Sequence, residues 1–290
     1  MYAIKTQSEL NIYKKRLAGN YIHYKLTHRE SPLTSTYPCY YDNWGIDMVS
    51  VAHITNNSFI EDYNLFRDGE TEVAIRENGK DFVGGATHGF EKIIDENNSR
   101  SFSLIIDNIG IGETDIFEGS CHSIIINQRS NLYREWTTDE IIAILDKEWR
   151  FDDKAGLVMN NTVTFTTNLD IWAAYGSMMC VLRRKYGAAS GPYITNRAIK
   201  NNEYKVFDVS DDWVDADLST TDANCTKITE YGELGFGFSM EVLERTEDNT
   251  GGMFVTTNGS VYNKIYSTFA KDTTVSSSAK YVMKTKWDIY

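Results

Sequence analysis

The sequence predicts a mainly β protein, an antiparallel β-sandwich or jelly roll with a short N-terminal helix. One observation is the aromatic content: 290 residues include eighteen Tyr and thirteen Phe but only three Pro. Many of these rings lie among Thr, Ser, Val and Ile, a mixture that fits pleated surfaces. The other observation is a succession of short alternating segments separated by turn signals, with few amphipathic helices between them. The chain is long enough for one large β domain or two smaller ones.

The best helical candidate lies within residues 7–29. Leu10, Tyr13 and Leu17 recur at spacings of three and four, as on one face of a helix. Gly19 and the asparagine after it are expected to end that helix. The segment that follows alternates well enough for either a strand or a further helical turn, and the pattern does not decide between them.

A boundary between two parts of the chain is expected near residue 35. Pro32 and Pro38 bracket a stretch of Ser and Thr that is typical of a loop. Residues 1–35 are therefore interpreted as a helical attachment or oligomerisation segment, and residues 36–290 as the β-sandwich domain. The alternative is a terminal helix that packs on its own domain.

Strands are predicted from period-two alternation between turn signals. The segment 171–184 is ambiguous, because its periodicity also fits a helix, but its β-branched and aromatic residues favour a strand. The dipeptide Asn258-Gly259 is the strongest two-residue hairpin signal. The expected strands cover residues 46–54, 71–76, 88–95, 101–107, 121–129, 141–151, 157–167, 171–184, 203–209, 225–231, 234–244, 252–257, 261–269 and 279–289.

Charge and hydropathy exclude several classes of function. A formal net charge of -12 opposes binding to nucleic acid or to an anionic membrane. No long apolar stretch and no signal-peptide core are present, which indicates folding in a cytoplasm. The four cysteines lie far apart, so we expect buried reduced thiols rather than disulfides or a zinc site.

The most distinctive stretch is residues 69–95, in which three glycines surround His88. Glycine tolerates positive φ and leaves room for a neighbouring backbone or a ligand. This cluster therefore predicts a sharp turn between two strands, with His88 at the turn. A purely structural role for His88 also fits this pattern: its imidazole would stabilise the glycine turn through hydrogen bonds to the backbone.

The blocks G-E-T-E-V-A-I-R-E, D-F-V-G-G and H-G-F-E within residues 69–91 resemble a segment of tail-fibre or receptor-binding proteins of tailed bacteriophages. The resemblance implies a virion tail protein, assembled in the host cytoplasm, that contacts bacterial surface polysaccharide or adapts the tail. It also implies other phage tail proteins as partners and a homo-oligomer, with a trimer as the natural arrangement. Nothing in it implies a cofactor.

An enzymatic alternative is a polysaccharide lyase or depolymerase on the same β scaffold. Elimination beside a uronic carboxylate needs a base, an acid and a group that neutralises the carboxylate. His88 and His122 are the candidate bases and Tyr133 the candidate acid, with Asn127 and Arg129 as neutralisers. Asn127 and Arg129 share one face of a strand, whereas His122 points away from that face.

Acidic residues around the glycine cluster are the candidate ligand-binding residues. Glu70, Glu72 and Glu91, together with His88, could contact sugar hydroxyls or supply a carboxylate pair for hydrolysis. The same carboxylates could bind Ca²⁺, but no calcium-loop spacing is present, so no metal site is predicted. The common nucleophile-elbow, phosphate-loop, dinucleotide-binding and zinc-protease motifs are also missing.

Overall fold

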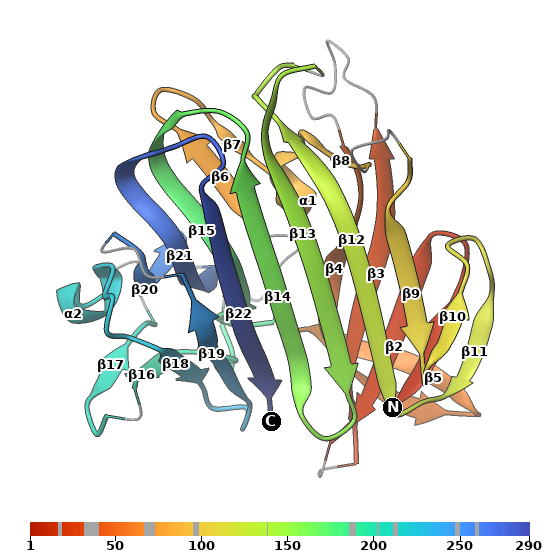
Figure 1. The fold of residues 1–290 in the computed structure, drawn as a ribbon. Coiled ribbons are helices and arrows are strands. Elements are labelled where there is room, and N and C mark those ends of the chain that lie inside the picture. Colours follow the sequence, from red (N-terminus) through yellow and green to blue (C-terminus); the bar gives the residue numbers. More distant parts are fainter. Residues whose placement is uncertain are drawn as a thin grey trace.

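The computed structural model describes residues 1–16, 19–31, 41–66, 73–94, 99–137, 139–185, 190–201, 203–210, 214–246, 250–258 and 261–290. This part of the chain is built almost entirely from strands, as the sequence predicts (Figure 1). The first half contains β1 (Tyr2–Lys5), β2 (Glu9–Lys15), β3 (Tyr21–Ser31), β4 (Tyr41–Thr55), β5 (Ser58–Asn64), β6 (Ala74–Glu77), β7 (Phe82–Val83), α1 (Gly85–His88), β8 (Glu91–Ile93), β9 (Phe102–Ile106), β10 (Ile109–Ile111), β11 (Phe117–Ser120), β12 (Ser123–Tyr133) and β13 (Ile141–Asp152). The second half contains β14 (Gly156–Phe165), β15 (Leu169–Leu182), β16 (Arg197–Lys200), β17 (Val206–Asp208), α2 (Ala216–Ser219), β18 (Lys227–Tyr231), β19 (Gly237–Arg245), β20 (Gly252–Asn258), β21 (Tyr262–Val275) and β22 (Lys280–Ile289).

One layer is a run of antiparallel strands that crosses the front of Figure 1. Its pairing runs from β9 through β12, β13, β14, β22 and β19 to β18. The long strands β12, β13 and β14 alternate buried and half-buried side chains, so one face packs inward and the other stays accessible. This accessible face is referred to below as the outer face.

Two groups of strands lie behind this layer (Figure 1). One is antiparallel in the order β11, β1, β2, β3, β4 and β5. The other is a separate five-stranded sheet in the order β20, β21, β15, β6 and β7. The short strand β8 pairs with β12 in the front layer and, in parallel, with β4 behind it, so it joins the two layers.

The layers enclose the hydrophobic core. Its largest fully buried side chains include Trp44 from β4, Trp149 from β13 and Trp287 from β22. Because these three indoles come from both layers and from distant parts of the sequence, the core holds the two faces together. The antiparallel sandwich predicted from the sequence is confirmed.

The predicted N-terminal helix is wrong. Residues 9–15 and 21–31 form β2 and β3, and the whole of β2 pairs with residues 21–27 of β3 around a turn at Gly19. Leu10 and Ile12 are both buried, which is the period-two pattern of a strand rather than the 3.6-residue period of a helix. Pairing with β1 and β3 therefore outweighs the helical spacing, and β1 to β3 belong to the same sheet as β4.

Several smaller predictions can be compared directly. The 171–184 segment is a strand, β15, as favoured. A tight turn at Asp107 and Asn108, both at positive φ, joins β9 to β10. Strands β20 and β21 pair as the predicted hairpin, although its glycine lies outside the described residues. Cys121, Cys180 and Cys225 are buried and take part in no disulfide, as predicted, whereas Cys39 lies outside the described residues. Neither short helix of the described chain is long and apolar enough to span a membrane.

Candidate functional site

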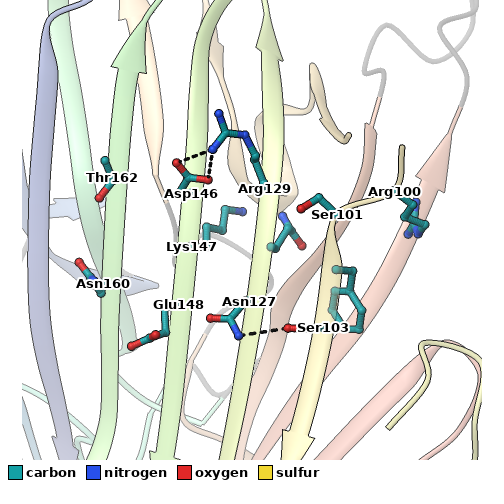
Figure 2. Close-up of a pocket in the computed structure, with 12 residues that line it drawn as sticks. Arg100, Ser101, Ser103, Asn127, Arg129, Asp146, Lys147, Glu148, Asn160 and Thr162 are labelled. Atoms are coloured by element: carbon teal, nitrogen blue, oxygen red, sulfur yellow. Dashed lines mark hydrogen bonds and ion pairs between the residues drawn. The ribbon is translucent and has the colours of Figure 1, made fainter. Parts of the chain in front are cut away.

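The outer face of the front layer carries a row of polar side chains. Cα pairing places Ser103 opposite Asn127, Asn127 opposite Glu148, and Glu148 opposite Asn160. Four positions on adjacent strands span about 14 Å at the usual strand spacing. Amide, carboxylate and hydroxyl groups are thus presented in a straight line across β9, β12, β13 and β14. Asn127 donates a hydrogen bond to the Ser103 hydroxyl at 3.1 Å (Figure 2).

A second row runs beside the first. Arg129 lies opposite Asp146, and Asp146 lies opposite Thr162. The Arg129 guanidinium donates to both Asp146 oxygens at 3.0 and 3.2 Å (Figure 2). In this ion pair the two charged residues of the row neutralise each other, and the two hydrogen bonds hold the guanidinium in one orientation.

The two rows surround a shallow hollow of about 540 Å³, referred to below as the outer hollow. Its rim on the β9 side is set by Arg100, which donates to both Asp42 oxygens at 2.8 and 2.9 Å and also pairs with Glu113. Hydrogen bonding to Glu113 raises the pKa of Arg100 above its usual value. The lining residues are Arg100, Ser101, Phe102, Ser103, Asn127, Gln128, Arg129, Asp146, Lys147, Glu148, Asn160 and Thr162.

The inward face beneath the outer hollow contains a buried polar network centred on Glu91 of β8. The Lys147 ammonium lies 2.7 Å from the Glu91 carboxylate, and Gln128 donates to it at 2.9 Å. Asn43 and the backbone N–H of Gly85 each donate to its other oxygen at 3.0 Å. Glu91 has no exposed surface, and charge-assisted bonds of this kind are strong away from water.

This network positions the outer hollow because Gln128 and Lys147, at its floor, alternate along their strands with the outward-facing residues that line it. Gln128 lies between Asn127 and Arg129 on β12, and Lys147 occupies the equivalent place on β13. Gln128 also accepts a hydrogen bond from the backbone N–H of Trp44 at 2.9 Å, which ties the front layer to β4. The register of β12 against β13, and therefore the order of the polar rows, is held from behind.

The glycine turn is the other part of this network. Gly84, Gly85 and Gly89 all have positive φ, as the sequence predicts for this cluster. The Gly84 N–H donates to the Gly89 carbonyl at 2.7 Å, which closes the turn, and the turn directs the Gly85 N–H at Glu91.

Replacing Gly84 by Ala is expected to lower the free energy of unfolding by about 1–3 kcal/mol. The reason is a combination of positive φ with a clash, since a Cβ there would lie 2.8 Å from the Val73 carbonyl oxygen. Gly79→Ala is the matched control, because Gly79 also has positive φ but a Cβ would meet nothing within 4 Å. Urea unfolding measures the free energy of unfolding of both variants, and the extra loss in Gly84→Ala is the contribution of the clash. Equal losses in the two variants would contradict this explanation.

The structure separates the predicted acid and base from the outer hollow. The His88 ring lies 5.1 Å from the ring of Phe82, and burial lowers the pKa of its imidazole. Tyr133 is buried in the cluster of hydrophobic residues that contains Phe90. Neither His88 nor Tyr133 is among the residues that line the outer hollow.

The predicted neutralising pair is found together. Asn127 and Arg129 lie on the same face of β12 and both line the outer hollow, as expected from their spacing. His122 precedes β12, is largely exposed, and contacts Asp153 at 3.0 Å.

In the part of the chain that the structure describes, the predicted acidic ligand-binding residues do not lie together at the surface. Glu70 and Glu72 lie outside the described residues. Glu91 is fully buried among hydrogen-bond partners, so this carboxylate serves the interior rather than a ligand at the surface. Within the described ranges, no group of three or more His, Cys, Asp or Glu side chains could hold a metal ion.

Three important lining residues were not predicted from the sequence: Asp146, Glu148 and Asn160. The signal was available for the first two, because D-K-E-W-R within the predicted strand 141–151 places alternate charged residues on one face. Asn160 could not be connected to them, since the order of strands in the sheet was unknown.

No protein-family model matches this sequence, and no curated protein matches it. Among solved structures, the chain has a likeness to the crystal structure of the heparan sulfate lyase HepC from Pedobacter heparinus. The TM-score is 0.37 and the identity is 9%, with 95% of this chain and 36% of the lyase covered. The chain thus spans little more than a third of the length of that enzyme, and a likeness of this size assigns it neither a family nor an activity.

Proposed function

We propose that this protein binds carbohydrate chains in the outer hollow. The observation that carries the proposal is the unbroken row of Ser103, Asn127, Glu148 and Asn160 across four strands. Amides, carboxylates and hydroxyls donate to and accept from sugar hydroxyls, and a row of them matches a ligand whose hydroxyls recur along a chain.

Charge favours a ligand without high net charge. The Arg129 guanidinium is already paired with Asp146, and Arg100 is paired with Asp42 and Glu113. A polyanion would have to displace these carboxylates, whereas a neutral or weakly acidic glycan can bind beside them. Because the hollow is shallow and open on the sheet face, a long chain can pass across it without requiring a free end.

The biological setting that we propose is a bacteriophage tail. It rests on the resemblance of residues 69–91 to tail-fibre and receptor-binding proteins. In that setting the protein is a virion component that assembles with other tail proteins, as a homo-oligomer, and binds bacterial surface polysaccharide. Several copies of a shallow site gain avidity on a repetitive polysaccharide, which offsets weak binding at each site.

Replacing Glu148 by Ala is expected to weaken binding to host surface polysaccharide about 10- to 100-fold, because charge-assisted hydrogen bonds are lost. Asn127→Ala and Asn160→Ala are expected to have smaller effects in the same direction. Arg150→Ala is the matched control: Arg150 is an exposed residue of β13 that does not line the outer hollow. Biolayer interferometry on immobilised polysaccharide measures all four, and equal binding by Glu148→Ala and Arg150→Ala would contradict the proposal.

A second candidate function is a polysaccharide lyase, and one observation favours it. Asn127 and Arg129, the pair expected to neutralise a uronic carboxylate, lie together in the outer hollow. A lyase would release unsaturated uronate that absorbs in the ultraviolet, and Arg129→Ala and Asn127→Ala would abolish that product. Arg150→Ala is again the control, and His88→Ala is expected to leave product formation unchanged, because His88 does not line the outer hollow. Saturable binding of uronate-containing polysaccharide without product would contradict the lyase and retain the binding function.

A further inference from the structure

A second hollow of about 640 Å³ lies at the opposite side of the β1 to β5 sheet from the core, and it is referred to below as the aromatic hollow. Its lining combines aromatic rings with hydroxyl, amide and charged groups. The lining residues are Met1, Tyr2, Ile4, Tyr13, Lys15, Tyr21, Ile54, Asn57, Ser58, Phe59, Glu118 and Ser120.

The aromatic hollow exists because the sheet curls. Phe59 lies on β5 and Tyr13 on β2, three strand positions apart, or about 14 Å in a flat sheet. Their ring centroids are nevertheless only 3.8 Å apart, with the planes nearly parallel at 11°. Strand β5 must therefore fold back over the outward face of β2 and β3. Tyr13 and His23 point away from the core yet are buried beneath that fold.

The folded strand is anchored at its polar end. His23 is fully buried and contacts Asn11 at 2.9 Å, Ser50 at 3.2 Å and Glu61 of β5 at 3.2 Å. Its ring stacks on Tyr13 at 4.5 Å, so His23, Tyr13 and Phe59 form a continuous stack. The aromatic wall is thus fixed by contacts on its buried side, and its open side is left to solvent.

The open side has the chemistry of a sugar-ring site. Phe59, Tyr2 and Tyr21 are half-buried, with Tyr2 5.5 Å from Phe59 and Tyr21 set edge-on to it at 5.1 Å. Rings in this arrangement present an apolar surface with polar edges. The Tyr2 hydroxyl donates to Glu118 at 2.8 Å, which places an oriented carboxylate beside the rings.

We propose that the aromatic hollow is a second carbohydrate site, which binds one hexose ring of a neutral glycan. The apolar C–H face of the sugar would pack on Phe59 and Tyr21, and its hydroxyls would meet Glu118, Asn57 and Lys15. Opposite charges on Lys15 and Glu118 favour a ligand without net charge. This site goes beyond the binding function of the outer hollow and involves none of its residues.

The test uses the full chain and a panel of methyl hexopyranosides, followed by saturation-transfer NMR and chemical-shift titration. Phe59→Leu and Tyr21→Leu are each expected to weaken binding about tenfold, because the ring is lost while apolar volume is kept. Tyr204→Leu is the matched control, since Tyr204 is fully exposed and does not line the aromatic hollow. If Phe59→Leu fails to fold, the half-buried Tyr21 carries the test.

A double variant separates the two sites. Asn127→Ala with Glu148→Ala is expected to keep the methyl-glycoside binding that Phe59→Leu removes. Binding lost only in the double variant would overturn the aromatic hollow as the methyl-glycoside site, whereas binding lost only in Phe59→Leu would support it and would leave polysaccharide binding in the outer hollow to its own test. Three results would overturn this inference: no binding of any glycoside, binding of adenine or indole instead, or dimerisation of the wild type that Phe59→Leu abolishes.

Discussion

Replacing Glu91 by Ala is expected to lower the free energy of unfolding by about 3–5 kcal/mol. The substitution removes the acceptor for Lys147, Gln128, Asn43 and the Gly85 N–H at once, all in a site without exposed surface. Breaking a buried pair from one side costs far more than the pair contributes, because the remaining charge stays buried. Urea unfolding followed by circular dichroism measures the loss.

A double-mutant cycle tests whether this loss of stability comes from the pairing of Glu91 with Lys147. Glu91→Met and Lys147→Met are each expected to be destabilising, and the variant that carries both is expected to lose less stability than the sum of the two single losses. Glu244→Ala is the control for removing a glutamate, because Glu244 is exposed on β19 and should change stability by about 0.5 kcal/mol or less. Additive losses in the cycle would show that Glu91 and Lys147 do not act together.

Replacing Glu230 by Gln is expected to stabilise the protein above neutral pH by about 3–5 kcal/mol. Glu230 on β18 is fully buried, and both its carboxylate oxygens lack a hydrogen-bond partner among the described residues. Burial raises the pKa of this carboxyl from 4.5 to about 8, an effect that the charge of Arg183 reduces. The neutral acid is therefore the form that the folded state prefers.

The raised pKa of Glu230 determines how the stability of the wild type changes with pH. The preference for the protonated form contributes fully below pH 4.5, where both folded and unfolded chains are protonated at this site. As the pH rises from 4.5 to about 8, the unfolded state gains by ionising first, so the wild type loses stability. The glutamine of the Glu230→Gln variant cannot ionise, so this variant should lose less stability than the wild type between pH 4.5 and about pH 8.

Urea midpoints measured from pH 5 to pH 9 provide the test. We expect the curves of wild type and Glu230→Gln to diverge progressively up to about pH 8 and to run parallel beyond it. Glu230→Met repeats the test without a buried amide, and Glu244→Gln controls for the loss of one acidic group. Curves that run parallel across the whole range would contradict a raised pKa at Glu230.

The sequence predicted much of the fold because alternation is a local signal. Period-two patterns predict strands at residues 141–151 and in the neighbouring segments, and the structure has strands there. The N-terminal error has the same origin. Leu10 and Tyr13 fit a helical spacing by chance, and only the partner strands β1 and β3 decide in favour of β structure.

The candidate site was predictable only within single strands. Asn127 and Arg129 were placed on one face correctly, because that depends on alternation alone. Their association with Glu148 and Asn160 depends on which strands are neighbours, and a lone sequence does not contain that order. Glu91 is a candidate ligand-binding residue in the sequence because it lies beside the glycine cluster, whereas its burial follows from partners that come from other strands.

The pairing of β14 with β22 also limits how this chain can fold. Leu157 pairs with Trp287, so the front layer remains open until a strand from much later in the sequence arrives. Contacts between such distant segments must overcome a large loss of chain entropy before they become favourable, which makes folding slow. During synthesis, the edge of β14 that pairs with β22 would stay exposed until β22 has emerged from the ribosome, as would the core around Trp149 that Trp287 helps to cover. We therefore expect shortened chains that end before β22 to aggregate, even though they contain every residue of the outer hollow.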